Sequence, residues 1–235
     1  MNLLHRLERW FAPNSIYRQL YPPPTLNLRF RRYVSSDRPK VIELHETNAP
    51  DRFPANSLPA FGRYVDSCPS SFFVVETDIQ GIIACGGVSA ITDHIHILCY
   101  GIVAPAFQGR GVGSALTLVR LVYATRSSGD NFSVLFAVPK SIGFYGRFGY
   151  TGNAMWKADE MKDYPIISLG YASSLIRPVE KILRKRGHSL DQTIPVERNK
   201  NLTATVKEAG PRLYAIELGP REAELSVTTK PSSSL

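Results

Sequence analysis

The sequence lacks an apolar run of about 18 residues, the length that a helix needs to cross a membrane. Its amino-terminal segment also lacks the unbroken apolar stretch of a secretory signal, because charged side chains interrupt it. Cysteine is scarce, and Cys68, Cys85 and Cys99 do not have the spacing of a metal site. We therefore expect a cytoplasmic protein without disulfide bonds, structural zinc or another bound metal.

Basic residues are scarce in the centre of the chain and concentrated at its ends. The net charge is +8 over 235 residues, of which residues 1–34 carry +5, residues 172–235 carry +4 and the residues between them −1. A protein that coats nucleic acid spreads basic residues over its binding face, so this distribution argues against a nucleic-acid partner. Residues 1–12 alternate apolar and basic positions with helical spacing, so contact with an anionic membrane surface is kept as an alternative.

Apolar periodicity predicts alternating strands and helices in the middle of the chain. Strands are expected at 28–34, 71–77, 81–91, 94–103, 132–138, 150–156 and 164–169, and helices after Asp37 and at 58–65, 114–126 and 139–148. The tail is expected to form a basic helix at 178–186, closed by Gly187, and a hairpin of 201–206 with 212–218. We therefore divide the chain into an amphipathic N-terminal extension (1–27), a central domain (28–171) and a C-terminal extension (172–235).

A glycine-rich turn between the strand at 94–103 and the next helix points to the chemistry. It has the sequence Gln-Gly-Arg-Gly-Val-Gly at 108–113. A helix start carries unpaired N–H groups and a positive dipole end, and glycines let this backbone close around a phosphate. The turn is not a Walker loop, because Gly-Lys-Ser/Thr is absent. It is not a dinucleotide-binding fingerprint, because Ser114 and Leu116 stand where the third glycine would be.

Two segments together resemble the GCN5-related N-acetyltransferase (GNAT) superfamily. The first, Val-Ala-Pro-Ala-Phe-Gln-Gly-Arg-Gly-Val-Gly at 103–113, looks like the family's strand-to-helix signature for acetyl-CoA. The second, Phe-Tyr-Gly-Arg-Phe-Gly-Tyr at 144–150, looks like its tyrosine-bearing helix and the strand that follows. The resemblance implies an α/β (α+β) fold with a mixed, twisted sheet of six to seven strands, splayed after strand four and flanked by helices. A helix and a hairpin would follow as the C-terminal extension.

The resemblance also implies how acetyl-CoA, the co-substrate, would be held without a metal. Its pantetheine arm would enter the splayed sheet and pair with the backbone of Ile102 and Val103. Its pyrophosphate would lie on the N–H groups from Gly109 to Ser114, while Arg110 would either contact phosphate or point into water. The residues of this turn are Gln108, Gly109, Arg110, Gly111, Val112, Gly113 and Ser114.

Tyr145 is the predicted catalytic residue. In the family pattern a tyrosine at this position lies near the thioester sulfur, where it would protonate the leaving thiolate. The alternative is a core aromatic whose hydroxyl is hydrogen-bonded. Many family members carry Asn seven residues earlier, where this sequence has Val138. The general base stays unassigned, and the candidates are His94, His96, Tyr100, Glu76 and a chain of water molecules.

The resemblance implies an N-acetyltransferase that moves an acetyl group from acetyl-CoA to a primary amine by direct attack in a ternary complex. One alternative is a non-catalytic acyl-CoA-binding module of the same fold. Another is a domain that docks to an anionic partner through its basic ends. The sequence does not identify the acceptor amine, and a homodimer formed through residues 172–235 is a further alternative.

Overall fold

The computed structural model describes most of the chain after residue 25. The described residues are Ile16 and residues 26–49, 51, 53, 56–67, 69, 71–125, 130–152, 154–156, 165–210 and 213–220. The predicted amphipathic helix at 1–12 therefore lies outside the described residues. Within the described part, no helix combines the length and the apolar character needed to cross a membrane.

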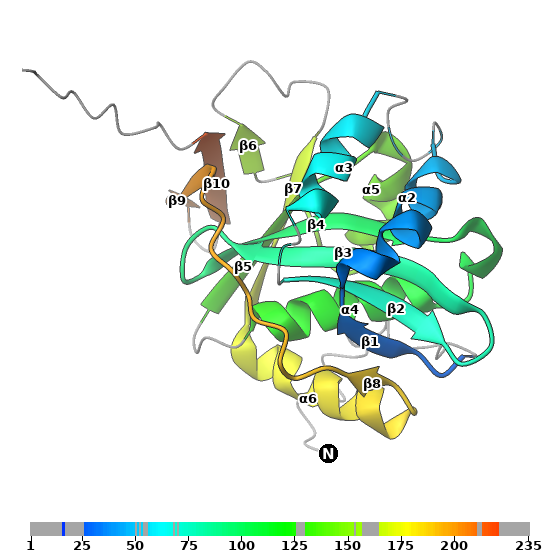
Figure 1. Cartoon of the computed structure of the whole chain (residues 1–235). Helices are drawn as coiled ribbons and strands as arrows, with labels where there is room; N and C mark the ends of the chain where they lie inside the picture. The colour runs from blue at the N-terminus through cyan, green and yellow to red at the C-terminus, as the bar shows by residue number, and fades with distance from the viewer. Residues whose placement is uncertain are drawn as a thin grey trace, which may run out of the picture.

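The centre of the fold is a mixed sheet, which Figure 1 shows with helices on both of its faces. Among the described residues its order is β7 (Ile166–Ala172), β5 (Asp130–Phe136), β4 (Ile95–Val103), β3 (Gly81–Ala90), β2 (Phe72–Thr77), β1 (Arg29–Arg32) and β8 (Ser189–Leu190). The β4–β5 and β1–β8 pairs are parallel, and the other neighbours are antiparallel. The predicted α/β class and mixed sheet are confirmed.

The helices bury their apolar residues against opposite faces of this sheet. Alternate residues of a strand point to opposite faces, so Phe73 and Val75 lie in one apolar cluster, and Phe72 and Val74 in another. The first cluster includes residues of α4 and α6, and the second includes residues of α2 and α3. The helices are α2 (Arg38–Glu46), α3 (Leu58–Asp66), α4 (Val112–Ala124), α5 (Pro139–Gly146) and α6 (Ser173–Lys185).

The sheet opens between β4 and β5. The two strands pair only from Ile95 to Ile97, opposite Phe132 to Val134. Over residues 98–103, the edge of β4 that faces β5 forms no ladder with it, although the same residues of β4 stay largely paired with β3. An unpaired strand edge offers backbone N–H and C=O groups to a ligand. The splay after strand four is therefore present.

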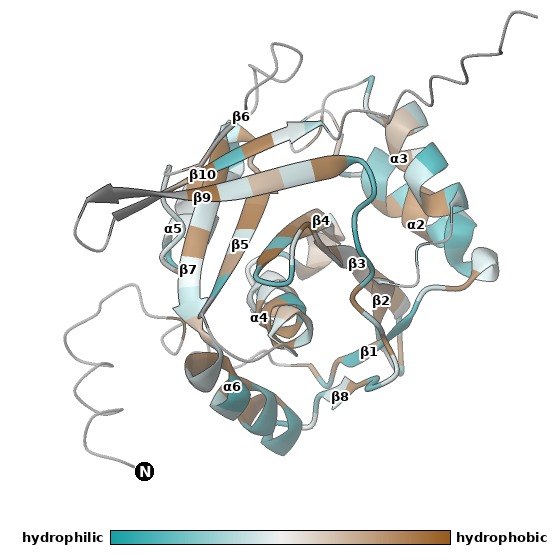
Figure 2. Cartoon of the chain, turned by 90° about the vertical axis from the view of Figure 1, so that its left-hand side faces the viewer, coloured by the Kyte–Doolittle hydropathy of each residue, from teal (hydrophilic) through white to brown (hydrophobic). Residues whose placement is uncertain are grey.

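The C-terminal part of the chain contributes to the central sheet and to a second sheet, whose order among the described residues is β6, β10 and β9. The hairpin of β9 (Leu202–Gly210) and β10 (Leu213–Pro220) forms as predicted, and β10 also pairs in parallel with β6 (Ala154–Trp156). The α6 helix begins at Ser173, five residues earlier than expected, and contains Pro178. Pro178 is the sixth residue of the helix and removes one backbone hydrogen bond, while the turn before it buries Ile176 in the core. Figure 2 shows many hydrophilic residues along the rest of α6.

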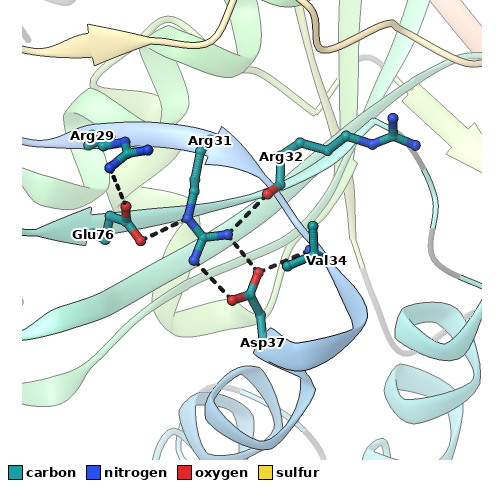
Figure 3. Close-up of polar contacts among 6 residues, drawn as sticks. All are labelled: Arg29, Arg31, Arg32, Val34, Asp37 and Glu76. Atoms are coloured by element: carbon teal, nitrogen blue, oxygen red, sulfur yellow. Dashed lines mark hydrogen bonds and ion pairs between the residues drawn. The ribbon is translucent and has the colours of Figure 1, made fainter.

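A half-buried arginine, Arg31, links β1 to β2 and to the start of α2 (Figure 3). The two Nη atoms of Arg31 donate to the Asp37 carboxylate at 2.7 and 2.9 Å, and its Nε donates to Glu76 at 2.8 Å. Burial would raise the pKa of the Asp37 carboxyl, but Arg31 and the N–H of Val34 hold that pKa below its usual value. The network holds β1 in register against β2, next to the edge strand β8.

Three buried histidines, His45, His96 and His188, should make the protein less stable in mild acid. Burial lowers the pKa of His96 and of His188 to about 4, from about 6.5 in an unfolded chain. Between pH 6.5 and 4 the unfolded state therefore binds more protons than the folded state, so stability is highest above pH 6.5 and falls toward pH 4. We expect a loss on the order of 1–2 kcal/mol per histidine between pH 7.5 and 5.0, measured by urea unfolding.

Exchanging His96 and His188 for uncharged residues, as in His96→Leu with His188→Gln, should flatten most of this profile and leave the contribution of His45, whose pKa burial also lowers. His94 lies before β4 and is exposed, and its charge adds to the burial that lowers the pKa of His96. The comparison variant His94→Gln should therefore change the profile by less than the exchange of the buried histidines. An equal unfolding midpoint at pH 7.5 and 5.0 in the unaltered protein would contradict the argument.

Candidate active site

A β-bulge bends β4 beside the opening of the sheet. Cys85 pairs with Ile102, but Gly87 pairs with Cys99, so one residue of β3 faces two residues of β4, Tyr100 and Gly101. Tyr100 has a positive φ of 42°, which is strained for a residue with a side chain. Bulges of this kind redirect backbone groups and side chains, and they occur often next to active sites.

A cavity of about 560 Å³ occupies the opening between β4 and β5. The residues that line it come from the second half of β4, the glycine-rich turn, α4, the end of β5 and α5. Polar and apolar side chains both contribute, among them Tyr100, Thr117 and Leu135. The cavity is therefore a cleft with one wall of strand backbone and a floor formed by α4.

The glycine-rich turn forms one end of this cleft. Gly109 and Gly111 have φ angles of 73° and 81°, a conformation that glycine adopts without strain, and α4 begins directly after Gly111. The first N–H groups of a helix have no hydrogen-bond partner within the helix. Gly113 and Ser114, in the first turn of α4, line the cavity. This end of the cleft is therefore suited to bind an anion.

The cleft brings together seven of the ten residues that the sequence predicts for the site. They are Val103, Gln108, Gly109, Gly111, Gly113, Ser114 and Tyr145. The other three do not line it. Ile102 packs into the apolar cluster of α2 and α3, and Val112, the first residue of α4, is buried in the core. The guanidinium of Arg110 lies 5.6 Å from the ring centroid of Phe107. Ile102 and Val112 can therefore offer only backbone groups.

Gln108 uses its amide inside the protein. Its Nε2 donates to the Asn48 side chain at 2.9 Å and to the Val103 carbonyl at 3.1 Å, and Asn48 donates to the same carbonyl at 3.2 Å. These bonds fasten the turn to the end of β4 and to the end of α2. Asn48, which the sequence analysis did not identify, thereby helps to shape the cleft.

Tyr145 lies at the other end of the cleft, on α5. Its half-buried ring packs against the rings of Phe144 and Tyr150, at centroid distances of 5.0 and 5.5 Å. Its hydroxyl accepts a 3.4 Å hydrogen bond from Nη2 of Arg120, a residue of α4 that the sequence analysis did not identify. Val138, at the position where many family members have Asn, also lines the cleft.

The candidate bases are dispersed. Glu76 is bonded to Arg31 at the far side of the sheet, His94 is exposed before β4, and His96 is buried without lining the cleft. Tyr100 alone among these side chains lines the cavity. The described residues contain no group of three or more histidine, cysteine, aspartate or glutamate side chains that could hold a metal ion.

Comparison with known families finds one matching domain. Residues 68–152 match the family model described as Acetyltransferase (GNAT) domain. The match spans β2 to the end of α5 and so includes both the glycine-rich turn and Tyr145. It confirms the family resemblance seen in the sequence. A search of curated proteins gives no match.

Solved structures with a similar fold have low sequence identity to this chain. A GNAT-family acetyltransferase from Brucella melitensis, in complex with acetyl-CoA, is 17% identical over 62% of this chain and 89% of its own, with a TM-score of 0.45. The PaiA N-acetyltransferase from Thermoplasma acidophilum, in complex with coenzyme A, is 14% identical over 62% of this chain and 100% of its own, with a TM-score of 0.49.

Proposed function

We propose that this protein is an N-acetyltransferase that moves an acetyl group from acetyl-CoA to a primary amine within a ternary complex. The observation that carries the proposal is one cleft that runs from the N-terminus of α4 to Tyr145. It presents the start of a helix, then the unpaired edge of β4, then a phenol. Acetyl-CoA carries its pyrophosphate, its pantetheine arm and its thioester in the same order.

The chemistry needs little from the protein beyond placement, because a thioester is already an activated acyl donor. The amine nitrogen attacks the carbonyl carbon, the C–S bond breaks, and the sulfur leaves with the electron pair. In this proposal Tyr145 donates a proton to that sulfur, and the bulged backbone of β4 stabilises the oxygen of the tetrahedral intermediate. The proton lost by the amine passes to solvent.

The acceptor would approach from the side of α2 and α3. Phe53 and Tyr100 line the cleft there, and Asp51 lies nearby in an exposed ion pair with Lys140, at 3.2 Å. An exposed pair of this kind contributes little to stability, so Asp51 is available to attract a cationic amine. These features support an amine acceptor without defining its size.

Binding of acetyl-CoA should depend on Gly113. A Cβ at this position would already lie 3.4 Å from the ring of Phe144, and a larger side chain would project into the cleft. We expect Gly113→Leu to weaken acetyl-CoA binding by at least about tenfold, measured by calorimetric titration with plain CoA and NADH in parallel. The loss corresponds to about 1.4 kcal/mol of binding free energy.

The matched control is Gly146→Leu in α5. A Cβ at Gly146 meets no atom within 4 Å, and the residue does not line the cleft, so this variant should keep the affinity of the unaltered protein. If the unaltered, folded protein takes up no acetyl-CoA at all, the proposed function is wrong.

A further inference from the structure

Arg120 is a fully buried arginine at the inner end of the cleft. It lies on α4, only 1% of its surface is exposed to solvent, and it lines the cavity next to Tyr145. Arginine is among the residues that are almost never buried unless they are paired. Its presence here therefore calls for an anion.

The described residues do not supply that anion. The guanidinium donates from Nη2 to two neutral hydroxyls, those of Thr117 at 3.3 Å and Tyr145 at 3.4 Å, and its Nε has no hydrogen-bond partner. Among the described residues no carboxylate forms an ion pair with it. The other ionisable groups that sense its charge are Cys85, Cys99 and Tyr150. Burying a charge without a counter-ion is costly, so a stable fold gains nothing from this arrangement.

The sheet is built to accommodate this side chain. A Cβ at Gly101, in the bulge of β4, would lie 2.7 to 3.0 Å from the guanidinium atoms, and a Cβ at Gly86 would lie 3.4 Å from the Cδ of Arg120. Any residue but glycine at 101 would thus displace the guanidinium. The bulge, two glycines and one arginine form a single arrangement that places a cation under the opening of the sheet.

We propose that Arg120 binds the sulfur of coenzyme A as a thiolate, and so acts as a catalytic residue beside Tyr145. The inference rests on the proposed function, in which the thioester lies near Tyr145. The hydroxyl of Tyr145 and the guanidinium of Arg120 adjoin each other at 3.4 Å, so a sulfur within reach of one is near the other. A cation without a partner in the ground state stabilises a transition state in which negative charge develops beside it.

The charge of Arg120 also affects the pKa of two buried thiols, those of Cys85 and Cys99. Burial raises the pKa of Cys99 to about 11, and Arg120 opposes that increase, as it does at Cys85. In the transfer step the amine nitrogen bonds to the carbonyl carbon, the C–S bond breaks, and the electron pair stays on the sulfur beside Arg120. The proton of the amine goes to solvent. Tyr145 protonates the sulfur when free CoA leaves, and its own proton is replaced from solvent.

Proton release on CoA binding tests the assignment. A free thiol has a pKa of about 8.5, so at pH 7.5 most of the added CoA carries the proton. Calorimetric titration with CoA in HEPES and in Tris, which differ in protonation enthalpy, should show release of about 0.9 proton per CoA bound. Acetyl-CoA has no thiol and should show none.

In Arg120→Met we expect CoA to bind about tenfold more weakly and without proton release, acetyl-CoA affinity to change by less than about threefold, and kcat to fall on the order of 100-fold. Its urea midpoint should be equal or higher, because methionine removes an unpaired buried charge. Arg120→Lys keeps the charge and should restore part of the proton release. Arg32→Met, which removes an exposed arginine of β1 outside the cleft, is the matched control.

Binding of both CoA and acetyl-CoA without proton release from CoA would overturn this inference and leave the proposed function intact. Succinyl-CoA that binds more tightly than acetyl-CoA, and only when Arg120 is present, would also overturn it by assigning the guanidinium to an acyl carboxylate. A protein that binds neither CoA nor acetyl-CoA would overturn the proposed function, and the inference with it.

Discussion

Removal of residues 173–235 is expected to leave a chain that does not fold. This segment supplies five buried residues to the core on the α4 side of the sheet: Ile176, Val179, Leu183, Leu190 and Ile194. Each such side chain contributes about 1.5–3 kcal/mol on burial, so their loss is comparable to the whole stability of an ordinary domain, about 5–15 kcal/mol. Far-ultraviolet circular dichroism and size-exclusion chromatography of the truncated chain would measure the outcome.

Single substitutions in α6 measure how much this segment contributes to stability. Leu183→Ala should lower the free energy of unfolding by about 2–5 kcal/mol, whereas Lys181→Ala, on the exposed side of α6, should change it by less than about 0.5 kcal/mol. A chain that ends after Pro220 keeps every described residue and serves as the control for truncation. If the chain that ends at Ala172 were folded and bound acetyl-CoA, this account of the C-terminal segment would be wrong.

Tyr145→Phe is expected to lower kcat by about 100-fold to 10,000-fold while acetyl-CoA affinity changes little. The range is that of a lost general acid, and the substitution keeps the ring contacts with Phe144 and Tyr150. It removes only the hydroxyl that faces Arg120. Release of CoA thiol in the presence of a panel of primary amines measures turnover, and calorimetry measures affinity.

Tyr150→Phe is the matched control. Its hydroxyl is buried, shares a 2.6 Å hydrogen bond with Ser133, and lies outside the cleft. The variant should lose stability of about 1 kcal/mol and keep its turnover within a few-fold. Loss of turnover in Tyr150→Phe but not in Tyr145→Phe would remove Tyr145 from the mechanism. If the unaltered protein binds acetyl-CoA and turns over no amine, the non-catalytic alternative is favoured.

The strands, the turn and the tyrosine were predictable because their signals are local. Glycine spacing at 108–113 indicates where a helix must begin beside an anion, and the alternating pattern from Ile95 to Val103 indicates a strand. Helix and strand limits differ from the prediction by a few residues, most at α6. There Pro178 suggested a helix start, yet burial of Ile176 favours an earlier first turn.

The remaining features depend on contacts between distant parts of the chain. β6 pairs in parallel with β10, and β1 with β8. Nothing in the sequence of these segments indicates which strand each of them pairs with. Arg120 was missed because arginine in a helix normally points to solvent. One signal was present in the sequence, since Arg120 follows Leu116 by four residues and Val119 by one, both on the side predicted to be buried.

The β1–β8 pair also sets when the fold can be completed. The amide of Leu28 donates to Nδ1 of His188, a contact that spans 160 residues of chain. During synthesis on the ribosome, β1 must therefore wait without its outer neighbour until nearly the whole protein has emerged. Contacts so distant in sequence slow folding, and an unpaired edge strand in the meantime is a site for aggregation. The sheet can therefore be completed at the edge farthest from the cleft only after the chain has been made as far as β8.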